Sequence, residues 1–127
     1  MLTRSQKYAQ AAYPRVADQI PPGTNVKNLS TKQKEYRTVA KKFPSLIHTC
    51  GLAQAIAFYQ AKGHSDYLED LAKVVGHAGH PEIKDAKSLA EQSRTNQLSL
   101  YMRLSRDTLT AAGWLKRYVE ALAGEEE

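Results

Sequence analysis

The sequence is poor in the features that mark secreted, membrane-spanning and disulfide-stabilised proteins. Its 127 residues include a single cysteine, Cys50, so no disulfide can form within the chain. No apolar run approaches the roughly 20 residues that span a bilayer, and no secretory signal opens the sequence. A chain with these absences is expected to be soluble, to contact no membrane and to reside in a reducing cytoplasm.

Signals for β-structure are also scarce. No segment alternates apolar and polar residues as a half-buried strand does, whereas apolar residues recur at intervals of three and four along most of the chain. Glycine and proline number only 7 and 5, and alanine is frequent, which favours helices. We therefore expect an all-α fold, a compact single-domain bundle of five or six helices over residues 1–127. Residues 21–29 should form a mobile linker, 76–87 a loop and 124–127 an acidic tail.

Capping residues and prolines set the expected helix boundaries. Three residue pairs have the spacing of a capping box: Thr3 with Gln6, Ser30 with Gln33, and Ser88 with Glu91. Pro44 should end the second helix and open the third, and Pro14 should kink or end the first. The expected helices cover residues 4–20, 30–43, 44–62, 66–75, 88–94 and 96–123. Their apolar faces include Tyr13, Leu98 and Met102, which we expect to be buried.

The charge is unevenly distributed along the chain. The formal net charge is +5, but residues 1–62 carry +8 and residues 63–127 carry −3. One basic row follows the second helix, where Lys34, Arg37 and Lys41, next to Lys42, should lie opposite the apolar face. A solvated helix face would produce the same pattern.

A second basic stripe lies on the last helix. At 100° per residue, Arg103, Arg106, Arg117 and Trp114 share one exposed arc. Arginine and lysine rows bind phosphate backbones with little readout of sequence, and an exposed Trp114 could stack on a base. Burial of Trp114 against another helix is the alternative. The two rows together favour a nucleic-acid-binding function.

Residues that could support catalysis do not form a convincing set. His77 and His80 fall in the expected loop without a further ligand, so we predict no metal site. The acidic residues that open the 66–75 helix suit its dipole. We find no nucleophile with a base at a suitable spacing and no phosphate-binding glycine loop. The sequence therefore predicts a protein that is not an enzyme and takes no cofactor or small-molecule substrate.

Protein assembly is a second class of function that the charge pattern favours. A basic first half and an acidic end could stack head to tail between copies, and contacts of this kind produce filaments when they do not close. A free-standing helical protein-interaction or DNA-binding module is the alternative. A helix-turn-helix reader needs polar side chains on its second helix, whereas the expected 44–62 helix is almost wholly apolar.

Three separated segments give the sequence a family resemblance. They are TRSQKYAQAAY, FPSLIHTCGLAQAIAF and WLKRYVEAL, at residues 3–13, 43–58 and 114–122. Together they resemble the small helical subunit of the Cmr effector complex of type III-B CRISPR systems, in order and over nearly the whole chain. The resemblance implies a non-catalytic subunit of an RNA-guided antiviral complex. It would stack with copies of itself beside the subunits that hold the guide RNA, and help to cradle the target RNA that neighbouring subunits cut.

The resemblance also adds basic residues to the candidate interface. Those near the shared segments are Arg4, Lys7, Arg15, Lys41, Lys42, Lys116 and Arg117. We expect Lys34, Arg37, Lys41, Lys42, Arg103, Arg106, Trp114, Lys116 and Arg117 to bind RNA. Arg4, Lys7 and Arg15 are expected to make secondary contacts with RNA or with other Cmr subunits.

Overall fold

The computed structural model describes residues 1–123, which form six α-helices and one short 3₁₀ turn, with no strand among them. The elements are α1 (Arg4–Gln19), η1 (Val26–Asn28), α2 (Thr31–Cys50), α3 (Leu52–Ala61), α4 (Ser65–Ala78), α5 (Ala86–Thr95) and α6 (Leu98–Ala123). The expected all-α bundle of five or six helices is confirmed. The predicted acidic tail at 124–127 lies outside the described residues.

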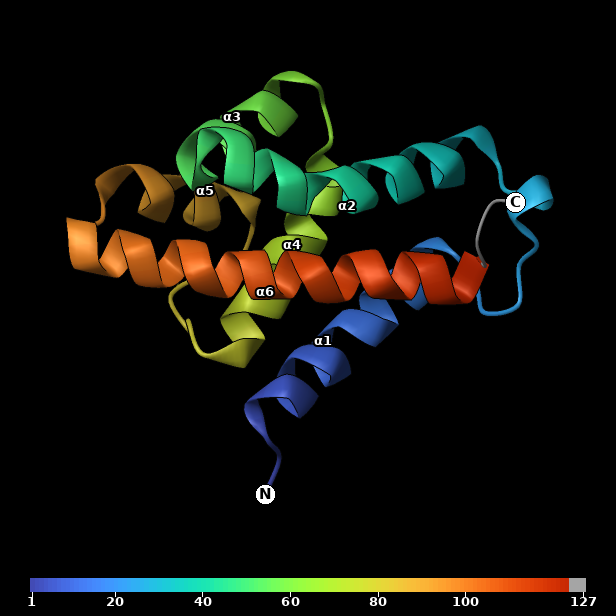
Figure 1. The fold of residues 1–127 in the computed structure, drawn as a ribbon, viewed down its shortest axis with the longest axis horizontal. Coiled ribbons are helices and arrows are strands. Elements are labelled where there is room, and N and C mark those ends of the chain that lie inside the picture. The colour runs from blue at the N-terminus through green and yellow to red at the C-terminus, as the bar shows by residue number, and fades with distance from the viewer. Residues whose placement is uncertain (124–127) are drawn as a thin grey trace.

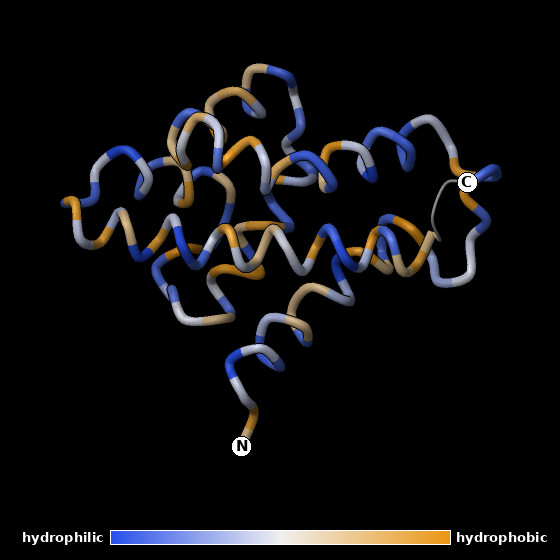
Figure 2. The backbone as a smooth tube through the Cα atoms, viewed as in Figure 1, coloured by the Kyte–Doolittle hydropathy of each residue, from blue (hydrophilic) through white to orange (hydrophobic). Residues whose placement is uncertain are grey.

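The long helix α6 organises the bundle. It runs along most of the longest dimension of the molecule, with α2 antiparallel along one side and α1 crossing on the other (Figure 1). Helix α4 packs against α1, and the short helices α3 and α5 lie near the beginning of α6. Apolar and polar residues alternate along α6 because only part of its circumference faces these neighbours (Figure 2). One continuous core results, to which all six α-helices contribute.

Two of the three predicted capping boxes are confirmed. The Thr3 and Ser30 hydroxyls accept hydrogen bonds from the Gln6 and Gln33 backbone N–H groups, at 3.1 Å each. The third prediction is wrong in register, because Asp85 rather than Ser88 caps α5. The Asp85 carboxylate accepts from the Ser88 N–H at 2.8 Å, and the Ser88 hydroxyl accepts in return from the Asp85 N–H at 3.0 Å. Helix α5 therefore begins two residues before Ser88.

The prolines do not end the helices in which they lie. Helix α1 continues through Pro14 to Gln19, and α2 continues through Pro44 to Cys50, so the predicted break at Pro44 is wrong. Burial of Phe43 and Ile47, one before and one after Pro44, helps to offset the backbone hydrogen bond that proline cannot make. The break falls instead at Gly51, whose φ of +83° is readily adopted only by glycine. The expected 44–62 helix is therefore the second half of α2 followed by α3.

Several other expectations of burial and boundary are corrected. Tyr13 is exposed, and Tyr8 takes the buried position on α1. Leu98 and Met102 are exposed because the first turns of α6 extend beyond most of their neighbours (Figure 1). Helix α4 extends past residue 75, so the loop spans 79–85 rather than 76–87. The expected linker at 21–29 includes η1 and the buried Leu29, and its mobility stays a prediction.

The loop after α4 returns along the helix that precedes it. The Ile83 side chain is buried in the core, and the Ile83 carbonyl oxygen lies against Gly76 on α4. A Cβ atom at position 76 would overlap that oxygen. Glycine at this position therefore permits a close approach between helix and loop.

A buried carboxylate joins three helices through hydrogen bonds. The Tyr36 hydroxyl on α2 donates to Asp70 Oδ2 on α4 at 2.6 Å, and Gln19 Nε2 on α1 donates to the same oxygen at 3.4 Å. Burial raises the pKa of Asp70 above its ordinary value, although both donors oppose this shift. Asp70 is therefore a structural group, a role that its place near the acidic start of the helix did not indicate.

We expect Tyr36→Phe to lower the free energy of unfolding by about 1.5 kcal/mol, because it leaves a buried carboxylate without its shortest hydrogen bond. Urea denaturation followed by circular dichroism measures the change. Tyr118→Phe is the matched control, since the Tyr118 hydroxyl has no hydrogen-bond partner among residues 1–123. Equal stability of the Tyr36 variant and the parent would contradict a stabilising role for this bond.

Candidate nucleic-acid interface

The strongest grouping of charge lies around Asp107 on α6. Arg4 Nη2 donates to Asp107 Oδ1 at 2.7 Å, and His80 Nε2 lies 2.8 Å from Asp107 Oδ2. Arg106 Nε lies 3.4 Å from Oδ1, and Arg103 Nε lies 4.0 Å from Oδ2. We call Arg4, Arg103 and Arg106 the arginine cluster. It joins the beginning of α1 to the middle of α6 through one shared carboxylate.

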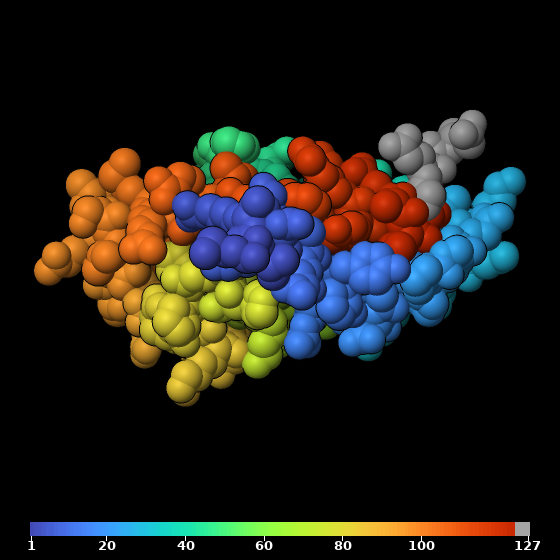
Figure 3. Space-filling view, turned by 90° about the horizontal axis from the view of Figure 1, so that it is seen from below, coloured from blue at the N-terminus to red at the C-terminus, as the bar shows by residue number. Residues whose placement is uncertain are grey.

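Local structure explains why these side chains meet. The capping box at Thr3 fixes the first turn of α1, so Arg4 is its first helical residue. Arg103 and Asp107 are separated by four residues and therefore share one face of α6. His80 follows the end of α4, where its carbonyl oxygen accepts from the Ile83 N–H at 2.8 Å. Figure 3 shows the first residues of the chain lying against α6 and beside the α4–α5 loop.

The arginine cluster is buried at its centre and exposed at its edge. The Asp107 side chain is only 4% exposed, whereas those of Arg4, Arg103 and Arg106 are 61%, 58% and 65% exposed. Burial alone would raise the pKa of Asp107, but the His80 hydrogen bond and the Arg4 charge outweigh it, and the pKa lies below its ordinary value. One carboxylate thus faces three guanidinium groups, which leaves most of their charge available to an external anion.

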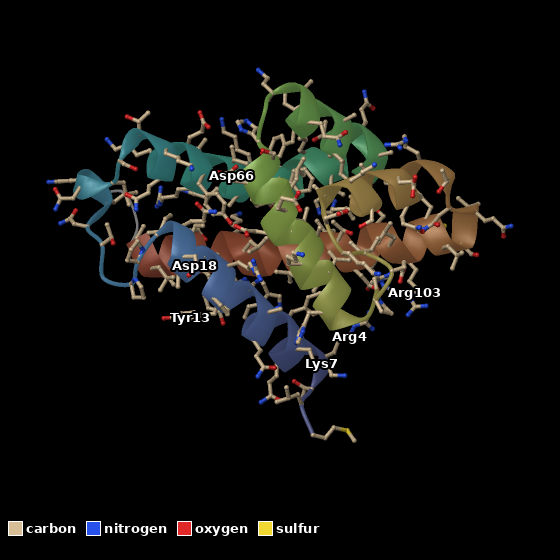
Figure 4. All side chains as sticks on the ribbon, turned by 180° about the vertical axis from the view of Figure 1, so that it is seen from behind. Arg4, Lys7, Tyr13, Asp18, Asp66 and Arg103 are labelled. Atoms are coloured by element: carbon tan, nitrogen blue, oxygen red, sulfur yellow. The ribbon has the colours of Figure 1, made fainter. Side chains whose placement is uncertain are left out.

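The two arginines labelled in Figure 4, Arg4 and Arg103, come from different helices and lie on the same side of the molecule. Lys7, one turn after Arg4, is exposed, and so is Arg15 further along α1. The buried carboxylate forms a hydrogen bond with the Arg4 guanidinium group and an ion pair with that of Arg103. Such groups can contact phosphate oxygens in pairs.

The rest of the α6 stripe is less exposed than expected. Trp114 is half-buried, and its ring lies 5.8 Å from that of Tyr118, centroid to centroid. Lys116 is also half-buried, whereas Arg117 is exposed. Arg117 lies about 21 Å along the helix from Arg103 at 1.5 Å per residue. Arg117 is thus too far away to belong to the arginine cluster, and contacts of these residues with RNA stay predictions.

The basic residues predicted to form a row on α2 do not share one exposed face. Lys34 and Lys42 are exposed and Lys41 is half-buried, but Arg37 is 7% exposed, so its expected place on the solvent face is wrong. Helix α2 packs against α6, α3 and α4, which widens its buried arc beyond the apolar stripe seen in the sequence. Arg37 is not available to an external strand, whereas Lys34 and Lys42 border a groove on another face.

Asp107 and His80 are the functional candidates that sequence reasoning missed. The available signal for Asp107 was an acid four residues after Arg103 and next to Arg106 on an otherwise basic arc. No comparable signal marked His80, which the sequence suggested only as a weak metal ligand paired with His77. His80 contacts Asp107 instead, and His77 is exposed.

Two further properties bear on the kind of site this is. Within residues 1–123, no three His, Cys, Asp or Glu side chains form a group suited to a metal ion. No helix in the same range is both long enough and apolar enough to cross a bilayer.

Comparisons with known proteins place this chain in a family. The model of the family described as "CRISPR-associated protein (Cas_Cmr5)" matches residues 4–122. The curated protein "CRISPR system Cmr subunit Cmr5" of Thermus thermophilus is 38% identical over 128 residues, which cover 98% of this chain and 100% of the relative. The crystal structure of a CRISPR-associated Cmr5 family protein from Thermus thermophilus superimposes with a TM-score of 0.79 at 37% identity. That match covers 95% of this chain and 98% of the other. The chain therefore belongs to the Cmr5 family of CRISPR-associated proteins.

Proposed function

We propose that this chain is a non-catalytic structural subunit of a Cmr effector complex and contacts the RNA backbone through the arginine cluster. The observation that carries the proposal is the sharing of one buried carboxylate by three exposed guanidinium groups from α1 and α6. Family membership supports the assembly, because the curated relative is named as a Cmr subunit. The RNA in question is the target strand, paired or pairing with the guide.

The chemistry of the cluster supports backbone contact rather than base readout. Arginine forks match the paired oxygens of a phosphate, and anchoring by Asp107 reduces the conformational entropy lost on binding. Contacts to phosphates position a strand without reading its sequence. A subunit with this surface suits a complex in which base pairing to a guide supplies the specificity.

Copies of the subunit are proposed to stack beside one another along the RNA. A charge of +8 over residues 1–62 and −3 over residues 63–127 supports a head-to-tail arrangement between neighbours. Each copy would contribute a few phosphate contacts, and the shared strand would add them together. We therefore expect the isolated chain to bind RNA much more weakly than the assembled complex does.

The test replaces Arg103 and Arg106 by Gln and leaves Arg4 and His80 to hold Asp107. In the reconstituted complex, we expect about tenfold weaker binding of target RNA, for every sequence tested, and a salt dependence flatter by about 0.7 per lost phosphate contact. Filter binding or fluorescence anisotropy at several salt concentrations measures both quantities.

The matched control removes two charges from another surface. Lys87→Gln with Arg94→Gln alters exposed residues of α5 and should leave the affinity unchanged. Equal affinity of the Arg103/Arg106 variant and the parent at every salt concentration would refute the arginine cluster as an RNA contact. A purified monomer that binds RNA as tightly as the whole complex would refute the additive role of the stacked copies.

A further inference from the structure

A groove between α2 and α3 is not accounted for by RNA binding at the arginine cluster. Two adjoining cavities of about 440 and 300 Å³ share Lys42, Phe58 and Tyr59 as lining residues. Val39 and Leu46 of α2 contribute to the walls of the first and the second cavity, respectively. We call these two cavities together the Phe58 groove. It is a continuous depression of a size that admits two side chains from a partner.

Phe58 gives this groove an exposed aromatic ring. Its side chain lies on α3, and the residue is 48% exposed although it borders two cavities with apolar walls. The Lys62 ammonium lies 5.3 Å from the centroid of the Phe58 ring, so a cation occupies the region over the ring. Binding clefts in proteins are lined mainly by hydrophobic and aromatic side chains, as this groove is.

The border of the groove is basic. Lys34, Lys42 and Lys62 line the larger cavity, and its only carboxylate among the described residues belongs to Glu35. Glu35 lies 4.0 Å from His64 Nδ1, on the same border. The excess of positive charge selects an occupant that carries negative charge around its apolar side chains.

RNA satisfies the charge but not the apolar interior. Nucleobases carry polar edges that need hydrogen-bond partners when they are buried. The walls include Thr38, Ser45 and Thr49, but most of their area is apolar. The Tyr59 hydroxyl already donates to the Val39 carbonyl oxygen at 2.8 Å. Aliphatic or aromatic side chains can fill such a space without an unpaired polar group.

We propose that the Phe58 groove binds an acidic amphipathic helix of another protein subunit. Two apolar side chains about one turn apart on that helix would occupy the two cavities, and flanking Asp or Glu residues would face Lys34, Lys42 and Lys62. The identity of the partner as a Cmr subunit rests on the function proposed above. The chemistry of the groove does not depend on it.

The first test uses the isolated chain with a synthetic peptide. The probe is a fluorescein-labelled helix with two leucines four positions apart and glutamates on either side of them. We expect Phe58→Ser, and separately Lys42→Glu with Lys62→Glu, to weaken binding of this peptide at least tenfold, or about 1.4 kcal/mol. Leu100→Ser and Lys87→Glu change an exposed apolar residue and an exposed lysine elsewhere, and should have no effect.

The second test uses the reconstituted complex with a photoreactive phenylalanine analogue at position 58. Cross-links to an acidic segment of a neighbouring subunit are expected, and the same analogue at position 100 is the control. Cross-linking of position 58 to RNA, or to no partner at all, would overturn the proposal. Equal affinity of the parent and all variants for the peptide would also overturn the proposal.

The two proposals can fail separately. The Arg103/Arg106 variant should bind the acidic peptide as well as the parent does, because the arginine cluster is on another face. Altered RNA binding by that variant together with unaltered peptide binding by Phe58→Ser would refute the groove alone. Unaltered RNA binding by the Arg103/Arg106 variant together with weakened peptide binding by Phe58→Ser would refute the arginine cluster alone.

Discussion

Gly76→Ala is expected to destabilise the protein by about 2 kcal/mol or more, at the upper end of what an added methyl group does in a packed interior. The new Cβ would overlap the Ile83 carbonyl oxygen, which is backbone and cannot rotate away as a side chain can. Relief requires the 79–85 loop to move off α4, which would expose Ile83. Urea denaturation followed by circular dichroism gives the change in the free energy of unfolding.

Gly113→Ala provides a matched control on α6. A Cβ at position 113 has no atom within 4 Å that it would meet, so the substitution should stabilise the helix by about 0.5 to 1 kcal/mol through helix propensity alone. Both substitutions add one methyl group to a glycine, but their effects on the free energy of unfolding should have opposite signs. A Gly76→Ala protein as stable as the parent would show that the loop does not pack tightly against α4.

Asp107→Asn is expected to cost about 2 kcal/mol at neutral pH, the usual range for lost hydrogen bonds to a buried charged group. The amide keeps the shape of the carboxylate but loses its charge and one of its acceptor atoms. Arg4 and His80 would then each compete for a weaker partner. Because Asp107 anchors the arginine cluster, the variant complex should also bind target RNA more weakly.

The stability loss should depend on pH in a defined direction. The pKa of Asp107 is lowered in the folded protein, so its contribution is fully present above the ordinary value of 3.8 and is lost as the pH falls through the lowered value. The difference in stability between the parent and Asp107→Asn should therefore begin to shrink as the pH falls below 3.8, and should disappear only below the lowered pKa. Thermal denaturation across an acidic pH series tests this convergence.

Asp70→Asn serves as the control, because Asp70 is a buried carboxylate whose pKa is shifted in the opposite direction from that of Asp107. The pKa of Asp70 is raised, chiefly by burial, so its ionised form opposes folding at neutral pH. A neutral amide still accepts from the Tyr36 hydroxyl, and the substitution should change stability by less than about 1 kcal/mol. An Asp70→Asn protein that loses as much stability as Asp107→Asn would contradict the distinction between the two sites.

Local rules predicted much of the helical framework. The caps at Thr3 and Ser30 depend on residues three positions apart, and these predictions are confirmed. The errors at Pro44, Leu98 and Met102 have a common cause. In each case the outcome depends on whether a neighbouring helix covers the position, which spacing along one helix does not reveal.

The candidate site was less predictable for the same reason. Arg103 and Arg106 could be grouped because they share a helix face. Their anchor required His80 and Arg4 to reach Asp107 across 27 and 103 positions of sequence. Arg37 was predicted to be exposed from its position along α2. It is buried because more than one neighbouring helix packs against α2.

The long sequence separation within the arginine cluster also sets when it can form during synthesis. Arg4 leaves the ribosome first, but its carboxylate partner follows 103 residues later. A nascent chain that lacks α6 therefore has the lysines of its first half but no organised arginine cluster. The arrangement proposed for RNA contact is therefore present only in chains that are nearly complete.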